Sequence, residues 1–275
     1  MANSKKPSTG AKAVVTGAGS GIGRALAVEL AARGGTVLCS DINLKAAQQT
    51  ARQIGGEAVG CDVSQADAVA ALARAAQELF DGGPTLMVNN AGIGVGGQPV
   101  GEHSLDDWRA ALNVNLWGAI HGAHFFAPLI RQHKSGGILT IASAASFGAM
   151  PWMAAYNVSK AGALALSETL RAEMAGTGIH VTAVCPTFVK TGIVENGRMS
   201  NAASSGAAKL MARTGITPDR VARAALEGLD ADRPYVLPNL DARALWMLKR
   251  AAPAAYGKVT RLVAARDPAG LRTPS

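Results

Sequence analysis

Cysteine is scarce in this chain of 275 residues, and its spacing indicates neither a disulfide framework nor a zinc site. The chain has an odd number of cysteines, Cys39, Cys61 and Cys185. They form no C-x-x-C pair, and each lies in a strand-like context. We therefore expect buried free thiols in the reducing environment of the cytoplasm.

Long apolar runs are also missing. No stretch of 18 apolar residues occurs, and the first residues, MANSKKPSTGAK, lack the apolar segment of a secretory signal. We expect a cytoplasmic protein that does not span the membrane. Aromatic residues make up only 4% of the chain against 32 glycines, while hydrophobic residues make up 48%. This composition favours an α/β fold with tight turns and a sizeable core.

Net charge is low over most of the chain, although the formal total is +8. The excess lies at the ends, with three lysines in residues 1–12 and seven Lys or Arg against two Asp in residues 241–275. Residues 13–240 carry equal numbers of basic and acidic side chains. Because no helix-turn-helix, zinc-finger or RNP-like string occurs either, we expect no nucleic-acid partner. The five histidines have no metal-ligand spacing, so no metal site is expected.

Short apolar runs alternate with longer segments of helical periodicity. Strands are expected at 11–17, 36–41, 57–63, 85–92, 136–143, 179–186 and 233–238. Helices are expected at 21–34, 43–56, 64–83 with Ser64 as N-cap, about 104–133, 154–176, and 217–232 with Thr217 as N-cap. Uniformly apolar strands that alternate with helices predict a single-domain, Rossmann-type, doubly wound parallel sheet with helices on both faces.

This catalytic domain is expected to span 11–238. Within it, Ser, Asn and Gly interrupt the pattern over about 187–216, which we expect to be a mobile substrate loop. Residues 239–275 form a basic amphipathic C-terminal extension, helical in pattern and broken at Pro253. That extension would lie on a membrane surface in weak contact, cover the active site or a partner subunit, or dock with one solvated face.

A glycine-rich turn, TGAGSGIG, runs from Thr16 to Gly23 between the first strand and the first helix. Glycines at Gly17, Gly21 and Gly23 allow close approach of a pyrophosphate to the helix N-terminus, although G-x-G-x-x-G spacing is not met. Asp41 ends the second strand, where a carboxylate would accept hydrogen bonds from adenosine ribose hydroxyls, repel a 2′-phosphate, or cap the next helix. Arg24 is the nearest basic candidate for a 2′-phosphate.

Two further polar groups, Asp62-Val63 and NNAG (Asn89 to Gly92), follow the third and fourth strands. They would hold adenine and brace the loops at the carboxyl edge of the sheet, where open α/β folds bind ligands. A tight turn alone would also explain NNAG.

Tyr156 and Lys160 are separated by one helical turn, so they share a helix face. A nearby ammonium favours phenolate, and we expect Lys160 to lower the pKa of Tyr156 so that the phenol exchanges a proton with a carbonyl or alcohol oxygen. Ser143 ends the preceding strand, and its hydroxyl would hold the same oxygen.

Six motifs follow one another along the chain: TGAGSGIG, Asp62-Val63, NNAG, Asn115 in NVNLWG, Ser143 and YNVSK. Through them the chain resembles the short-chain dehydrogenase/reductase family over about 11–238. The resemblance implies an NAD-dependent oxidoreductase acting on CH-OH groups, with NADP the less favoured cofactor. It implies a catalytic tetrad of Asn115, Ser143, Tyr156 and Lys160, with Tyr156 as acid/base and Asn115 anchoring a water that links Lys160 to solvent. The cofactor contacts it implies are Gly17, Ser20, Gly21, Ile22, Gly23, Asp41, Asp62, Val63, Asn89, Ala91, Gly92, Tyr156, Lys160, Pro186, Val189 and Thr191. Thr187 departs from the family, which usually has Gly there.

The apolar stretch between Ser143 and Tyr156 holds Phe147, Met150, Trp152 and Met153. These side chains would line a pocket for a bulky, apolar secondary alcohol or ketone, or pack into the core or a subunit contact. An NADP-dependent carbonyl reductase and a non-catalytic dinucleotide-binding protein remain alternative functions. The resemblance and the apolar helices at 104–133 and 154–176 predict a homo-oligomer, a tetramer.

Overall fold

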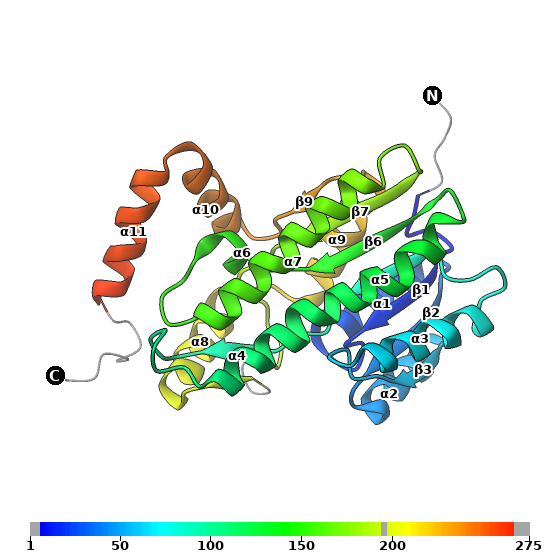
Figure 1. Ribbon diagram of the computed structural model, residues 1–275, viewed down its shortest axis with the longest axis horizontal. Coiled ribbons are helices and arrows are strands. Elements are labelled where there is room, and N and C mark those ends of the chain that lie inside the picture. Colours follow the sequence, from blue (N-terminus) through cyan, green and yellow to red (C-terminus); the bar gives the residue numbers. More distant parts are fainter. Residues whose placement is uncertain (1–5, 194–196, 267–275) are drawn as a thin grey trace.

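The computed structural model describes residues 6–193 and 197–266, with the side chains of residues 201, 202 and 266 excepted. Within these residues, seven parallel strands form one sheet in the order β3-β2-β1-β4-β6-β7-β9 (Figure 1). The strands are β1 (Lys12–Thr16), β2 (Thr36–Asp41), β3 (Glu57–Gly60), β4 (Leu86–Asn89), β6 (Gly136–Ile141), β7 (Ile179–Val184) and β9 (Tyr235–Val236). The fold class predicted from the sequence is confirmed.

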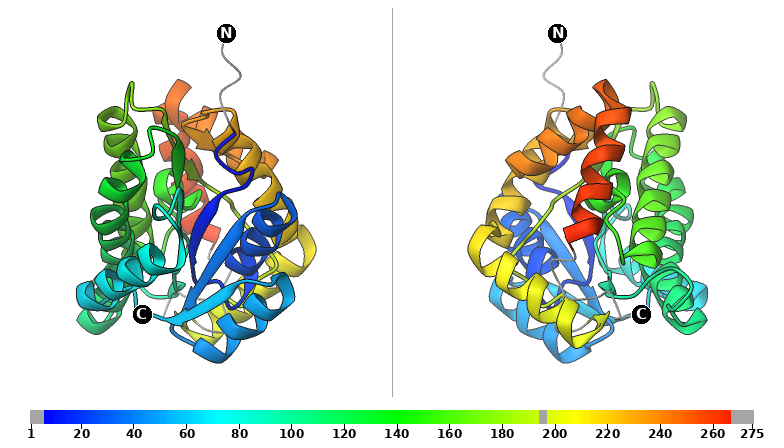
Figure 2. Two further views of the ribbon diagram at one scale, coloured as in Figure 1. Left: turned by 90° about the vertical axis from the view of Figure 1, so that its right-hand side faces the viewer. Right: turned by 90° about the vertical axis from the view of Figure 1, so that its left-hand side faces the viewer.

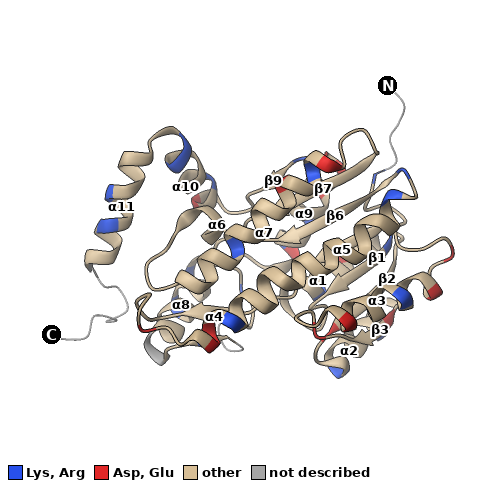
Figure 3. Ribbon diagram, in the orientation of Figure 1, with Lys and Arg blue, Asp and Glu red and all other residues tan. Residues whose placement is uncertain are grey.

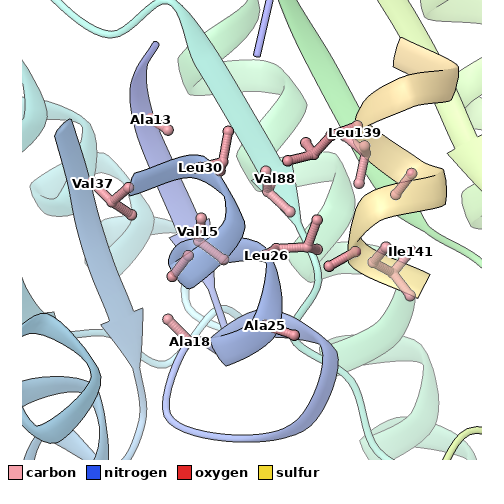
Figure 4. Close-up of a cluster of buried hydrophobic side chains, with 14 of the residues drawn as sticks. Ala13, Val15, Ala18, Ala25, Leu26, Leu30, Val37, Val88, Leu139 and Ile141 are labelled. Carbon is pink, nitrogen blue, oxygen red and sulfur yellow. The ribbon is translucent and has the colours of Figure 1, made fainter. Parts of the chain in front are cut away.

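Helices cover both faces of the sheet (Figure 2). One face carries α1 (Gly21–Ala32), α2 (Leu44–Ile54) and α9 (Pro218–Asp230), and the other carries α3 (Ala66–Leu79), α5 (Gly118–Arg131) and α7 (Ala154–Glu173). Alternate strand residues supply the two cores: Ala13 and Val15 of β1 face α1, while Val14 faces α3 and α5. Figure 4 shows the first core, where Leu26 and Leu30 of α1 lie over the strands. Their burial fixes the start of α1 above the end of β1.

The strand order reverses between β1 and β4. Chain connections run from β1 to β2 and β3 on one side, and from β4 to β6 and β7 on the other. The loops after β1 and β4 therefore diverge and leave a crevice at the carboxyl edge of the sheet, which is where folds of this kind bind ligands.

Remaining elements complete the helical regions expected from the sequence. The segment 104–133 is divided into α4 (Leu105–Leu112), the π-helix η1 (Asn113–Trp117) and α5. Thr217 caps α9 by accepting a hydrogen bond from the N–H of Arg220, as predicted. The prediction for Ser64 is wrong, because α3 begins at Ala66 and no side chain caps it.

The segment 187–216 is more regular than its sequence indicated. It contains α8 (Asn201–Thr214), and its strand β8 (Arg198–Met199) pairs with β5 (Val95–Gly96). The last helices of the described residues are α10 (Leu240–Ala251) and α11 (Pro253–Arg266), interrupted before Pro253 as expected. The short helix α6 (Ala145–Gly148) lies under α10 (Figure 1).

Candidate active site

The glycine-rich turn between β1 and α1 forms the floor of a cleft at the crevice. Gly17 and Gly21 have positive φ angles of 64° and 52°, which glycine adopts without strain. Gly23 leaves no room for a side chain, since an added Cβ would lie 2.1 Å from the carbonyl oxygen of Gly17. The turn thus packs directly on the start of α1, whose free N–H groups and positive dipole end suit a phosphate.

Thr16 and Asn90 hold this turn to the loop after β4. Thr16 Oγ1 donates to the carbonyl of Val88 at 3.1 Å and accepts from the N–H of Asn90 at 3.0 Å. Asn90 Nδ2 donates to the carbonyl of Thr16 at 2.8 Å. Asn90 lines the cleft, and sequence reasoning did not single it out although it lies inside NNAG.

Asn89, by contrast, does not line the cleft, and its role as a cofactor contact stays a prediction. Its side chain is buried behind β4, and a Cβ added to Gly122 of α5 would lie 1.9 Å from its Oδ1. Alternation along the strand explains the placement, because Asn89 is the last residue of β4 and faces away from the crevice.

Asp41 lies at the cleft and stabilises the glycine-rich turn. Its carboxylate accepts hydrogen bonds from the N–H of Gly19 and of Asn43, both at 2.9 Å. The cap of α2 is Asn43, which accepts from the N–H of Ala46 at 3.2 Å, so Asp41 is not the N-cap. Arg24 donates to the carbonyl of Gly19 and lines a separate hollow rather than the cleft.

The cleft has a volume of about 570 Å³ and brings most of the predicted site together. The predicted residues that line it are Gly17, Ser20, Gly21, Ile22, Asp41, Asp62, Val63, Ala91, Gly92, Tyr156, Lys160, Pro186, Val189 and Thr191. Gly23, Asn89, Asn115 and Ser143 do not line it. Among the described residues that do, Lys160 is the sole cation.

Tyr156 and Lys160 share the buried face of α7 at the end of the cleft away from Asp41. Lys160 Nζ donates to the carbonyl of Ile141 at 2.9 Å and lies 5.9 Å from the centre of the Tyr156 ring. Burial lowers the pKa of Lys160 to about 8, and Cys185 raises it in part. Burial also raises the pKa of the Tyr156 phenol, against the lowering effect of a hydrogen bond with Ser143.

The expected lowering of the pKa of Tyr156 by Lys160 is therefore wrong for this structure. Desolvation of the phenol has the largest effect on its pKa and outweighs the hydrogen bond with Ser143, while the Lys160 ammonium donates to a backbone carbonyl. A phenol with a raised pKa is protonated at neutral pH and is ready to donate its proton.

Asn115 fixes the loop beside Lys160. Its Oδ1 accepts from the N–H of Ile93 at 2.8 Å, and its Nδ2 donates to the carbonyl of Ile93 at 3.0 Å and to Ser159 Oγ at 3.1 Å. A Cβ added to Gly92 would lie 3.0 Å from Asn115 Oδ1 and 3.3 Å from Lys160 Nζ. The two side chains thus close around Gly92, and Asn115 acts here by holding the loop.

The apolar residues between Ser143 and Tyr156 do not line the cleft. Phe147 is 4% exposed and packs edge-on against Trp246 of α10, with ring centres 4.8 Å apart. Apolar side chains that do line the cleft include Ile93, Ile193 and Met211, which sequence reasoning missed. The sequence offered only two indications of them: Ile93 directly follows NNAG, and Ile193 and Met211 lie within 187–216.

The three cysteines are buried and free, as expected. Burial raises the pKa of Cys39 and Cys185 to about 12 and that of Cys61 to about 11, so these thiols are protonated at neutral pH. No group of three or more potential metal ligands occurs among residues 6–193 and 197–266. Across the same ranges, no helix combines the length and the hydropathy that crossing a membrane requires.

Comparison with known proteins agrees with this geometry. Residues 11–202 match the family model for short chain dehydrogenases. A probable oxidoreductase, EphD, of Mycobacterium tuberculosis is 34% identical over 265 residues, which cover 90% of this chain but only 44% of that protein. A 1-deoxy-11-beta-hydroxypentalenate dehydrogenase of Streptomyces exfoliatus is 34% identical over 238 residues and 84% of both chains.

A solved structure is similar over nearly the whole fold. It is a short chain dehydrogenase/reductase from Burkholderia phymatum in complex with NAD, with a TM-score of 0.83 and 32% identity. The match covers 90% of this chain and 96% of that one.

Proposed function

This chain belongs to the short-chain dehydrogenase/reductase family of oxidoreductases, and we propose that it interconverts a bulky secondary alcohol and its ketone with NAD as the hydride carrier. The observation that carries the proposal is the cleft itself. It joins a glycine-rich helix start and Asp41 at one end to Tyr156 and Lys160 at the other. One elongated ligand with a phosphate centre and a reactive end matches this arrangement.

The residues present fit a dinucleotide. The start of α1 with Gly17, Ser20 and Gly21 would take the pyrophosphate, Asp41 the adenosine ribose, and Pro186, Val189 and Thr191 the nicotinamide half. NAD is favoured over NADP because a carboxylate repels a 2′-phosphate. Arg24, the candidate for a 2′-phosphate, already donates to the carbonyl of Gly19 outside the cleft. The Burkholderia relative was solved with NAD.

When bound, NAD would supply the hydride chemistry of the reaction, and residues of the chain would handle the proton. Tyr156 gives its phenolic proton to the ketone oxygen during reduction and takes it back from the alcohol during oxidation. Ser143, hydrogen-bonded to Tyr156, orients the same oxygen. Lys160 supplies a positive charge beside the ring, and Asn115 keeps the loop at Gly92 in place.

The lining of the cleft bears on the class of substrate. Ile93, Ile193 and Met211 contribute apolar surface to the cleft, which favours a substrate with a hydrocarbon skeleton over a sugar-like polyol. The Streptomyces relative is named as a dehydrogenase of a hydroxypentalenate, and a D-threitol dehydrogenase of Mycolicibacterium smegmatis is 36% identical over 187 residues, 66% of this chain. The apolar lining favours the first kind of substrate.

The test is NADH formation at 340 nm against secondary alcohols that range from small and aliphatic to steroidal, repeated with NADP. Turnover with NAD on the bulky members supports the proposal. Turnover with NADP alone would favour the carbonyl-reductase alternative. Binding of NADH without turnover on any alcohol would favour a non-catalytic dinucleotide-binding protein.

We also propose a homo-oligomer, a tetramer, in the cytoplasm. Residues 113–130 contain no charged side chain, although they lie on the outer helices η1 and α5 (Figure 3). Trp117 is 50% exposed there, and Val158 of the neighbouring α7 is 49% exposed. A second copy covering this face would bury both. Light scattering that gives a monomer mass would contradict this.

A weak membrane contact through the C-terminal extension remains a secondary proposal. Met247 and Leu262 are 67% and 58% exposed, and Arg243, Arg250 and Arg261 lie on the same two helices (Figure 3). Cosedimentation with vesicles containing anionic lipid, and its loss at high salt, would support the contact. Equal recovery with and without vesicles would contradict it.

A further inference from the structure

Thr187 connects the segment after β7 to the start of the C-terminal extension. Its hydroxyl donates to Asp241 Oδ1 at 2.9 Å, and its N–H donates to Asn239 Oδ1 at 3.2 Å. Asn239 Nδ2 also reaches the carbonyl of Phe188 at 3.4 Å. Two consecutive residues after β7 are thereby held by two residues more than 50 positions further along the chain.

The segment held in this way crosses the cleft. Near its start, the carbonyl of Pro186 accepts from the N–H of Ala144 at 2.8 Å and from Ser143 Oγ at 3.5 Å. At its far end Thr191 lies against the glycine-rich turn, because a Cβ added to Gly21 would lie 3.1 Å from Thr191 Cγ2. Residues 186–191 therefore run from the proposed catalytic serine to the proposed phosphate site.

The helix that supplies the anchor is itself fixed. Ala242 of α10 is fully buried in a cluster with Ala142 and Cys185. Leu245 fits over Gly148 of α6, where an added Cβ would lie 2.8 Å from Leu245 Cδ2. Because these contacts dock the first turns of α10 on the sheet and α6, Asn239 and Asp241 are fixed points and not parts of a free tail.

We propose that Asn239 and Asp241 are positioning residues for the nicotinamide half of the cofactor, acting through Thr187 on residues 186–191. The inference rests on the proposed function. It also gives the Thr187 hydroxyl a role, since this hydroxyl donates the hydrogen bond that ties residues 186–191 to Asp241. Without this hydrogen bond, ordering residues 186–191 around the ligand costs binding free energy.

The experiment compares two ligands by calorimetry: NADH, and ADP-ribose, which lacks the nicotinamide. Thr187→Val removes the hydroxyl and keeps the branched shape, while Thr187→Ser keeps the hydroxyl. We expect Thr187→Val to weaken NADH about 3- to 10-fold, the range of one ordinary hydrogen bond, because the contact with Asp241 is exposed, and to leave ADP-ribose within about 2-fold. Thr187→Ser should bind NADH like the wild type.

A matched control is Thr177→Val, which removes a hydroxyl that donates to the carbonyl of Met174 at 2.6 Å before β7, at the opposite edge of the sheet. It should change neither affinity. Asp241→Ala should weaken NADH as Thr187→Val does, and the double variant should add little to either. Thermal melts of each variant establish that it is folded.

Unchanged NADH affinity in Thr187→Val, or equal weakening of ADP-ribose, would overturn this inference and leave the proposed function standing. Fully additive effects in the double variant would overturn it too. A wild-type protein that binds neither ligand would refute the proposed function itself, and this inference with it.

Discussion

Lys160 Nζ lies 5.9 Å from the centre of the Tyr156 ring, yet it donates its hydrogen bond to the carbonyl of Ile141 and not to the phenol. Spacing by one helical turn indicated a direct ammonium–phenol partnership, and it places the two groups on one face as expected. The spacing also indicated that Lys160 would lower the pKa of Tyr156, but burial of the phenol raises it. Reduction of a ketone at this site therefore starts from a neutral phenol, whereas oxidation of the alcohol requires the phenolate.

The raised pKa of Tyr156 can be measured directly in the ligand-free protein. Tyrosinate absorbs near 295 nm, and the difference between the wild type and Tyr156→Phe isolates one phenol. We expect this phenol to ionise at higher pH than an exposed tyrosine, because burial raises its pKa by disfavouring the phenolate. Ionisation below pH 9 would show that Lys160 controls the phenol after all.

The buried ammonium of Lys160 should lower the free energy of unfolding at neutral pH. Its pKa is about 8 in the fold against 10.5 ordinarily, so the unfolded chain holds the proton more tightly. The cost, on the order of 3 kcal/mol, is fully present below pH 8 and is relieved as pH rises towards 10.5. Lys160→Met should therefore raise the free energy of unfolding at pH 7, less what the lost hydrogen bond to Ile141 contributes.

That gain should shrink steadily between pH 8 and 10.5 in urea denaturation. Lys45→Met, which removes an exposed ammonium on α2, is the control and should show no such trend. A gain from Lys160→Met that stays constant with pH would contradict the account.

Asp41 should set the choice between NAD and NADP. Asp41→Asn removes the negative charge and keeps the size of the side chain. We expect the ratio of the Kd for NADPH to the Kd for NADH to fall about tenfold or more, equivalent to ~1.4 kcal/mol. Using a ratio cancels any general loosening of the turn at Gly19. Asp62→Asn removes a second carboxylate of the same cleft and should leave the ratio unchanged.

Trp246 should be the residue that docks the C-terminal extension. Its ring lies 4.8 Å from that of Phe147 and 5.0 Å from that of Tyr235. Trp246→Ala should lower the free energy of unfolding by about 2–4 kcal/mol, somewhat less than truncation of a fully buried aromatic residue, because Trp246 is half-buried. Met247→Ala, at the adjacent and 67% exposed position, should change it by less than about 0.5 kcal/mol. Equal effects would mean that α10 is not docked in solution.

The sheet and its crevice could be predicted from the sequence because local patterns determine them. Apolar runs such as residues 179–186 and glycine stops such as Gly55 indicate elements and their ends without knowledge of distant residues. The glycine-rich turn, Asp41 and the Tyr156–Lys160 face follow from spacing along single elements.

The rest depends on contacts between distant segments. Asn89 and Asn90 are indistinguishable in NNAG, and only the packing of Gly122 decides which of them faces the cleft. Phe147 packs against Trp246, almost 100 positions later in the chain, and therefore does not line the expected pocket. The pKa of Tyr156 depends on burial, which helical spacing does not measure.

The most direct test of the central claim is turnover by Tyr156→Phe, followed as NADH formation at 340 nm on the best alcohol of the panel. Tyr235→Phe is the control, since Tyr235 donates to Glu168 outside the cleft. We expect Tyr156→Phe to lose about 10²- to 10⁴-fold in kcat while binding NADH like the wild type, and Tyr235→Phe to keep its activity. Undiminished turnover by Tyr156→Phe would contradict the proposed acid/base role and the mechanism built on it.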